Sequence, residues 1–338
     1  MTLRGRGRVA LPLALALGAA CFEPAPPTWK IEDPRLLLIE MEVVEAGPDS
    51  TPLTLDPPGL TRREGLPGDR LALRPIVVGP DGPVEPNGAP IWLRSRGLAS
   101  GYFEAPIQSC AEDPAEILQV CRLDGPEVVM PQVAFKTNGV VSWFVVVVFG
   151  TPGGPTSEAC LERLSGDGSE SLHGCLVGEA SLTYGPPHGL VPYGLADPAT
   201  PVTDPNYNLV DLALSLEIRG ASGVRTHVAA HGEIVEVDPD DAIAAKPIVD
   251  DAQRQEYVEE GGELATEGLY RIWWSDAEIF DHDWNAGIEV PESRFTIPPN
   301  VARVDLYLQI LDRPPYFGAR GNWLWVRLQV RGRSGSGS

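Results

Sequence analysis

The 338-residue chain has few basic residues, with 26 Lys and Arg against 47 Asp and Glu and a net charge of −21. A field of this sign repels nucleic-acid phosphates and anionic membrane surfaces, so we expect no nucleic-acid partner. Long apolar runs are also missing. The most apolar stretch, Val140–Phe149, has only ten residues, whereas a membrane-spanning helix needs about 20. Its β-branched composition predicts a strand that is buried on both faces.

The usual signatures of catalysis are absent as well. The sequence contains no G-x-S-x-G motif, phosphate loop or dinucleotide-binding glycine fingerprint. His227 and His231 have the spacing of a zinc-protease helix, but Val228 stands where that helix needs a glutamate. The flanks favour a strand with two polar residues on one face. We therefore predict a non-enzyme, and an envelope hydrolase is the least favoured alternative.

Segments of helical period are scarce, whereas 36 glycines and 34 prolines separate short apolar runs. This composition favours β-sandwiches, although 112–121 could hold a short helix. The stretch from Tyr184 to Pro205 is rich in proline and glycine and is the predicted domain boundary. The predicted fold is all-β, with two tandem immunoglobulin-like β-sandwich domains at 35–205 and 206–331 and a flexible tail at 332–338. Seven candidate strands make up the second domain: Leu209–Arg219, Thr226–Ala230, Ile234–Val237, Gly268–Ser275, Ser293–Ile297, Val301–Leu311 and Asn322–Arg331.

The first segment, 1–20, has the build of a secretory signal peptide, with three arginines, a short apolar core and small residues before Cys21. This arrangement resembles the bacterial lipoprotein signal, in which the cysteine becomes the N-terminus and carries the lipid. The resemblance implies a lipid anchor at Cys21. The proline-rich composition after it predicts a semi-rigid tether, so that 21–34 comprises the lipidated cysteine and the tether. Phe22 and Glu23 follow, without the aspartate that retains many lipoproteins in the inner membrane, so the outer membrane is the expected location. The alternative is an ordinary secretory signal with a free Cys21.

Four further cysteines, Cys110, Cys121, Cys160 and Cys175, remain in a chain that is expected to be exported. Their even number and this context favour disulfides. Of the three possible connectivities we favour Cys110–Cys121 and Cys160–Cys175, because each pair closes a short polar loop. A four-cysteine zinc site is the alternative, but no C-x2-C spacing supports it.

One acidic loop has oxygen ligands at the spacing of a calcium-binding loop: Asp281, Asp283, Asn285, Glu289 and Glu292. Ala286 stands where such a loop needs its turn glycine, so a solvated acidic loop is the simpler reading. We expect no cofactor, with calcium at this loop as the alternative.

Three tryptophans are candidate binding residues: Trp284, Trp323 and Trp325. Trp323 and Trp325 share one face of a strand. If exposed, they could stack on sugar rings. If buried, they belong to a sandwich core, which is the preferred interpretation.

Several segments of the second half carry a resemblance to a known group of proteins. They are Gly268–Trp274, Phe295–Pro298, Val304–Asp312 and Gly318–Val330, together with the upstream opening strand at Pro34–Leu37 and the Pro67-Gly68-Asp69 turn. Their order resembles predicted myxobacterial surface lipoproteins of unknown function that have immunoglobulin-like domains. The resemblance implies location and fold, and it supplies no catalytic residues. The expected role is that of a lipid-anchored envelope protein in binding, adhesion or structure, with the membrane, another envelope protein or a glycan as partner. A calcium- or glycan-binding module is the alternative.

Overall fold

The computed structural model describes residues 30–47, 65, 68–95, 107–110, 120–130, 144–165, 171–182, 212–249, 254, 256–258, 264–266, 268–279, 286–287, 292–313 and 320–332. These residues form antiparallel sheets with one short helix, α1 (Ser157–Leu164). The prediction of an all-β fold is confirmed. The predicted domain boundary, Tyr184–Pro205, lies outside the described residues.

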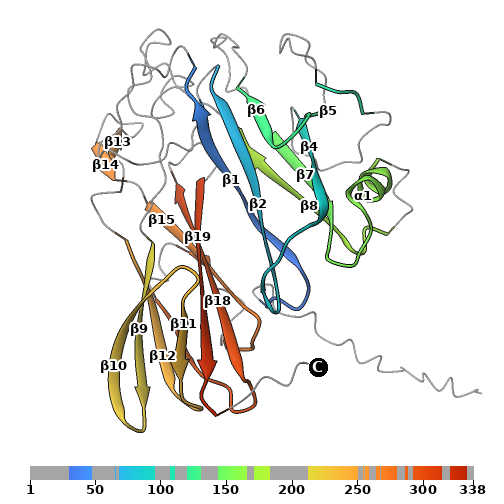
Figure 1. Cartoon of the computed structure of the whole chain (residues 1–338). Helices are drawn as coiled ribbons and strands as arrows, with labels where there is room; N and C mark the ends of the chain where they lie inside the picture. Colours follow the sequence, from blue (N-terminus) through green and yellow to red (C-terminus); the bar gives the residue numbers. More distant parts are fainter. Residues whose placement is uncertain are drawn as a thin grey trace, which may run out of the picture.

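The first sandwich, coloured blue to green in Figure 1, consists of two facing four-stranded sheets. In one sheet β2 pairs with β1, β3 and β6, and the other has the order β5-β4-β7-β8. The order β1-β2-β6 matches strands A-B-E of an immunoglobulin domain, and β5-β4-β7-β8 matches C′-C-F-G. The strands are β1 (Arg35–Glu45), β2 (Arg70–Gly79), β3 (Gly82–Pro83), β4 (Asn87–Ser95), β5 (Val120–Arg122), β6 (Glu127–Val129), β7 (Phe144–Gly150) and β8 (Cys175–Ser181).

Strand β7 is buried on both faces, as its sequence predicts. Val145, Val147 and Phe149 point into the core between the two sheets, beside Trp92 of β4. Val146 and Val148 point the other way and pack against α1. The alternation follows from the period of two in a strand. A tryptophan on strand C is a hallmark of immunoglobulin cores, and Trp92 occupies that place.

Helix α1 covers the outer face of the β7 sheet and connects β7 to β8. Thr156 caps it by accepting a hydrogen bond from the Ala159 amide at 3.2 Å. Cys160, Leu161 and Leu164 form its buried stripe. The sequence reading missed this helix. The short helix expected at 112–121 lies mostly outside the described residues, and its last two residues belong to β5 instead.

The favoured disulfide pairing is confirmed, with bonds between Cys110 and Cys121 and between Cys160 and Cys175. The first joins the segment before β5 to β5 itself. The second attaches α1 to the start of β8. Both therefore brace loops at one side of the first sandwich rather than joining its two sheets.

Removing the second disulfide should weaken the first sandwich. The bond spans a sequence separation of 15 residues, and closing a loop of that length contributes about 3 kcal/mol in the chain-entropy model. We expect the double variant Cys160→Ala, Cys175→Ala to lose about that much free energy of unfolding in urea titrations. A change below about 1 kcal/mol would show that packing of α1, rather than the cross-link, holds this region.

The second sandwich, yellow to red in Figure 1, repeats the same topology. Its sheets have the orders β10-β9-β12-β17 and β11-β19-β18-β15-β16. Here β9-β12-β17 corresponds to A-B-E and β16-β15-β18-β19 to C′-C-F-G. Strand β11 adds a parallel edge to β19, and β13–β14 form a separate hairpin. The strands are β9 (Ala213–Gly220), β10 (Gly223–Ala230), β11 (Ile234–Val237), β12 (Ala242–Ile248), β13 (Glu256–Val258), β14 (Leu264–Thr266), β15 (Gly268–Ser275), β16 (Ala286–Gly287), β17 (Ser293–Thr296), β18 (Arg303–Arg313) and β19 (Arg320–Val330).

The core of the second sandwich is built from the inward residues of both sheets. Strands β18 and β19 contribute alternate apolar residues, among them Leu306, Leu308 and Val326. Trp273 of β15 lies in this core with 1% exposure. It occupies the strand C position, as Trp92 does in the first sandwich. The two tandem immunoglobulin-like sandwiches expected from the sequence are therefore present.

Candidate functional site

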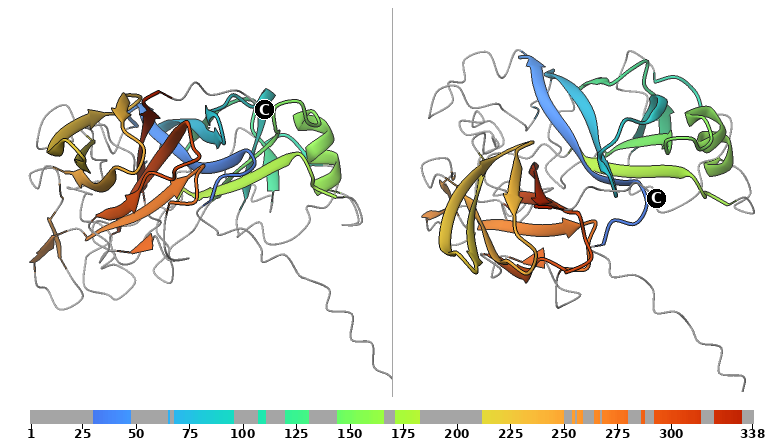
Figure 2. Two further views of the ribbon diagram at one scale, coloured as in Figure 1. Left: turned by 90° about the horizontal axis from the view of Figure 1, so that it is seen from below. Right: turned by 60° about the horizontal axis from the view of Figure 1, so that its bottom comes forward.

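Several buried polar side chains lie at the junction between the two sandwiches. Strand β18 presents Asp305, Tyr307 and Gln309 away from the core of its own sandwich, yet all three are buried. Tyr307 packs against the first sandwich, whose strands β1 and β2 lie against this sheet (Figure 2). Sheet β19-β18-β15 is thus covered on both faces.

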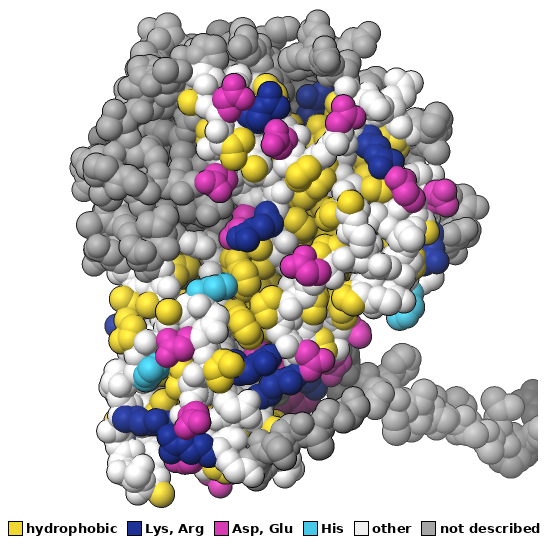
Figure 3. Space-filling model, in the orientation of Figure 1, with side chains coloured by type: hydrophobic (Ala, Val, Ile, Leu, Met, Phe, Trp, Pro, Cys, Tyr) yellow, Lys and Arg dark blue, Asp and Glu magenta, His cyan; other side chains and the backbone are white. Residues whose placement is uncertain are grey.

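Apolar side chains of both sandwiches meet in one cluster at this junction. The first sandwich contributes Leu37, Leu38, Ile76 and Val78. The second contributes the ring of Tyr307, and three tryptophans pack around the edge: Trp274, Trp323 and Trp325. In Figure 3 hydrophobic side chains are visible where the two sandwiches meet, between acidic and basic ones. Burial of apolar area at about 25 cal/mol per Å² makes such contact favourable.

The β2–β3 turn of the first sandwich, Gly79–Gly82, inserts into polar groups of the second. The Tyr307 hydroxyl donates to the Gly79 carbonyl at 3.2 Å, and Arg327 donates to the Asp81 carbonyl at 2.7 Å. Arg303 donates to the Pro80 carbonyl at 3.2 Å and forms an ion pair with the Asp81 carboxylate. Gly82 has a φ of +119°, and a Cβ there would lie 3.2 Å from Arg327 Nη2. Only glycine fits this turn without strain.

Asp305 organises these contacts from the centre of the junction. Its side chain has 0% exposure. It accepts hydrogen bonds from Arg327 Nε at 2.8 Å, Arg327 Nη2 at 2.9 Å and Trp325 Nε1 at 3.0 Å. Hydrogen bonding between the Arg327 guanidinium and the Asp305 carboxylate raises the pKa of Arg327. Burying a carboxylate costs free energy unless the charge is paired and hydrogen-bonded. The bidentate contact with Arg327 meets both conditions for Asp305.

A second buried carboxylate, Asp276, lies directly behind Asp305. The Asp305 amide donates to Asp276 Oδ1 at 2.8 Å, and Arg303 Nε is 4.0 Å from Asp276 Oδ2. Burial is the main cause that raises the pKa of Asp276 from 3.8 to about 7, and the negative charge of Asp305 adds to it. The hydrogen bond from the Asp305 amide and the charge of Arg303 lower the pKa of Asp276, but they do not offset the effect of burial.

The first described residues of the chain lie at the same junction. Lys30 and Ile31, here called the strap, precede β1 and pair with the second sandwich before the first one begins. Lys30 forms a parallel β-bridge with Ser275, and the Ile31 amide donates to the Ser275 carbonyl at 2.8 Å. Ile31 is completely buried, and Lys30 Nζ lies 2.7 Å from a carboxylate oxygen of Glu278.

Trp323 and Trp325 lie on one face of β19, as predicted. The two interpretations of that face, a sandwich core and an exposed platform for sugar rings, both need correction. They are neither in the sandwich core nor on a free platform, because the first sandwich covers them in part. The Arg327 guanidinium lies 5.4 Å from the centroid of the Trp325 ring, within the range of a cation–π contact. The sequence could not show this, since the covering surface is about 250 residues away along the chain.

His227 and His231 do not form a metal site. His227 lies on β10, which is a strand, with its Nε2 at 2.6 Å from Glu233 Oε1. His231 follows β10 and packs edge-on against Trp323, with 4.4 Å between ring centroids. Burial lowers the pKa of His231. Within the described ranges, no three His, Cys, Asp or Glu side chains are placed to hold a metal ion.

Most of the predicted calcium loop lies outside the described residues, namely Asp281, Asp283, Asn285, Glu289 and the neighbouring Trp284. Glu292 is described and forms an ion pair with Arg294. Calcium binding therefore stays a prediction. Cys21 and the whole signal segment also lie outside the described residues. In the part that the structure describes, no helix has the length and apolarity to cross a bilayer.

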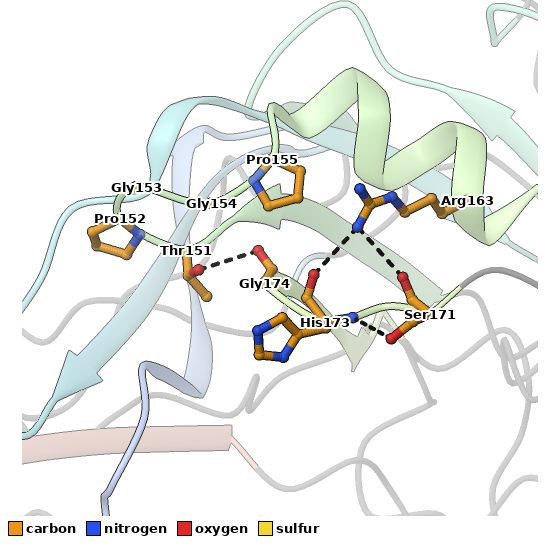
Figure 4. Close-up of a pocket in the computed structure, with 9 residues that line it drawn as sticks. All are labelled: Thr151, Pro152, Gly153, Gly154, Pro155, Arg163, Ser171, His173 and Gly174. Carbon is orange, nitrogen blue, oxygen red and sulfur yellow. Dashed lines mark hydrogen bonds between the residues drawn. The ribbon is translucent and has the colours of Figure 1, made fainter.

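A surface hollow of about 720 Å³ lies at the opposite end of the first sandwich, between the start and end of the α1 connection (Figure 4). Arg163 of α1 donates to the carbonyls of Ser171 and His173 at 3.4 and 3.2 Å, and Thr151 Oγ1 donates to the Gly174 carbonyl at 3.2 Å. These polar groups hold the loop before β8. The hollow is open, and its contacts serve the local fold.

Comparisons with known proteins give no relatives: no family model, no curated protein and no solved structure matches this chain. The description of both sandwiches as immunoglobulin-like therefore rests on their strand orders alone.

Proposed function

We propose that this chain is a lipid-anchored protein of the bacterial cell envelope, held at the outer membrane through Cys21. In this proposal the two docked sandwiches form one body with a binding, adhesion or structural role rather than a catalytic one. The resemblance of Met1–Cys21 to a lipoprotein signal supports the anchor. The two disulfides support an oxidising compartment outside the cytoplasm.

The strap is the observation that carries the proposal. Lys30 is nine residues after Cys21, and nine extended residues span at most about 30 Å. A lipid on Cys21 would hold the body within that distance of the bilayer, with the junction nearest to it. Because the strap bonds to Ser275 before the chain enters β1, a pull on the anchor would act on both sandwiches together. An anchored protein that bears load or positions a partner needs such an attachment.

The experiment is replacement of the proposed lipid-bearing sulfur. We expect Cys21→Ser to move the protein from the detergent-extracted membrane fraction to the soluble fraction. Intact-mass analysis should show acyl chains on the wild type and none on the variant, because three acyl chains at about 0.8 kcal/mol per methylene make detachment negligible.

The matched control is the double variant Cys110→Ser, Cys121→Ser. It makes the same chemical change at a disulfide and should stay in the membrane fraction with its acyl mass intact. The proposal fails if the wild type has no acyl chain, or if Cys21→Ser remains in the membrane fraction with an unchanged mass.

A further inference from the structure

We propose that Asp276 makes the docking of the two sandwiches sensitive to pH, so that its protonation tightens the junction and its ionisation loosens it. The inference is independent of the anchor, because it concerns only contacts between described residues. It starts from the position of the carboxyl group. Asp276 is next in sequence to Ser275, the residue that binds the strap, and its side chain shares Arg303 with the Asp81 turn of the first sandwich.

The charges at the junction explain the direction of the effect. With Asp276 protonated, Arg303 and Arg327 balance Asp305 and Asp81, and Arg303 is free to hold the turn of the first sandwich. Ionised Asp276 adds a third acid to two arginines. It competes with Asp81 for Arg303 and lies beside the buried Asp305, where like charges repel. The ionisable groups around it are Arg303, Asp305 and Tyr307 on β18, Arg327 on β19, Glu278 after β15, Lys30 with its partner Glu32 on the strap side, and Asp81 in the β2–β3 turn.

Linkage gives the sign and the size. Burial raises the pKa of Asp276 to about 7 in the docked form. Undocking takes Asp81 away from Arg303, which leaves this cation to Asp276 and Asp305, and so moves the pKa of the Asp276 carboxyl toward its ordinary value of 3.8. The docked form then holds the proton more tightly, so docking weakens as pH rises from about 4 through 7. A complete return to that value would make the docking equilibrium about 30-fold more favourable at pH 5.5 than at pH 8.5, which is the upper limit of the effect.

His231 acts in the opposite direction and has to be separated from this effect. Its pKa is lowered by burial, while Glu40 raises it and Arg74 lowers it further. Protonation of His231 below its ordinary value of 6.5 therefore opposes the packed arrangement. The wild type should therefore show a smaller change in the docking equilibrium between pH 5.5 and pH 8.5 than Asp276 alone would cause. His231→Gln should show the whole effect of Asp276.

Amide hydrogen exchange of the Ile31 N–H measures docking directly, because this hydrogen bond crosses the junction. We expect its protection factor in the full chain, corrected for the intrinsic rate, to be higher at pH 5.5 than at pH 8.5 in His231→Gln, by up to about 30-fold. Amides of β7 serve as internal references and should not change in parallel.

Asp276→Asn should remove the pH response, and Asp240→Asn should leave it intact. Asp240 is an exposed turn residue with a φ of 65°, a conformation that asparagine tolerates. Carbon-13 NMR of the Asp276 carboxyl in the wild type provides a readout that needs no variant, with an expected midpoint near pH 7. The proposal is overturned if that midpoint is near 4, if His231→Gln shows equal Ile31 protection at both pH values, or if Asp276→Asn keeps the response.

Discussion

Replacement of Asp305 by alanine is expected to lower the free energy of unfolding by about 3–5 kcal/mol, because it leaves a largely buried arginine without its partner. The Arg327 side chain is 19% exposed and directs two N–H groups at this carboxylate. Trp325 Nε1 also donates to it. The variant removes the acceptor of all three hydrogen bonds and leaves Arg327 only the Asp81 carbonyl. A buried charge without its counter-ion costs far more than a well-made pair contributes.

Glu236→Ala is the matched control for this prediction. Glu236 forms an ion pair with Arg331 in the same sandwich, but both side chains are exposed, at 68% and 48%. Exposed pairs contribute about 0–1 kcal/mol, so the control should stay close to the wild type. Denaturant titration followed by circular dichroism measures both. If the two variants lose similar amounts of free energy of unfolding, Asp305 does not hold the junction.

The second large effect is expected from Trp273→Ala, which should lower the free energy of unfolding by about 3–5 kcal/mol. Trp273 is 1% exposed and packs among the inward residues of both sheets of the second sandwich. Its removal leaves a cavity as well as losing the transfer free energy of the indole ring, and close-packed neighbours collapse into such a space only in part.

Trp274→Ala is the control, because the next residue of the same strand points to the opposite face. Trp274 is partly buried at the junction, where the Arg35 guanidinium lies 4.9 Å from its ring centroid. We expect it to lose less stability than Trp273→Ala while weakening the junction. Far-UV circular dichroism is the suitable probe, since both variants change the fluorescence. A greater loss in Trp274→Ala would contradict the assignment of faces.

Local sequence patterns were sufficient to predict structural features whose interacting residues are close along the chain. The β-branched run ending at Phe149 predicts a strand buried on both faces, and the structure shows one. The short spacings within each cysteine pair favour the two disulfides that form. Helix α1 was missed although Thr156 is a good N-cap residue, since eight residues carry only two turns of periodicity.

The junction could not be read from the sequence, because period two distinguishes only the two faces of a strand. In β18 the polar Asp305 and Gln309 alternate with apolar residues, a pattern that normally indicates a face toward water. Both are buried, and Tyr307 between them packs against the first sandwich. The tryptophans of β19 show the same limit. One local signal could have indicated that another domain covers this face. It is the combination of an acid and a tyrosine on one strand face with tryptophans and an arginine on the next strand.

Calorimetry of the full chain near neutral pH tests most directly whether the two sandwiches behave as one body. The strap, the Asp81 turn and the Asp305 contacts predict a single cooperative transition in the wild type, and two separated transitions once Asp305 is replaced by alanine. Two independent transitions in the wild type, unchanged by that replacement, would contradict the account.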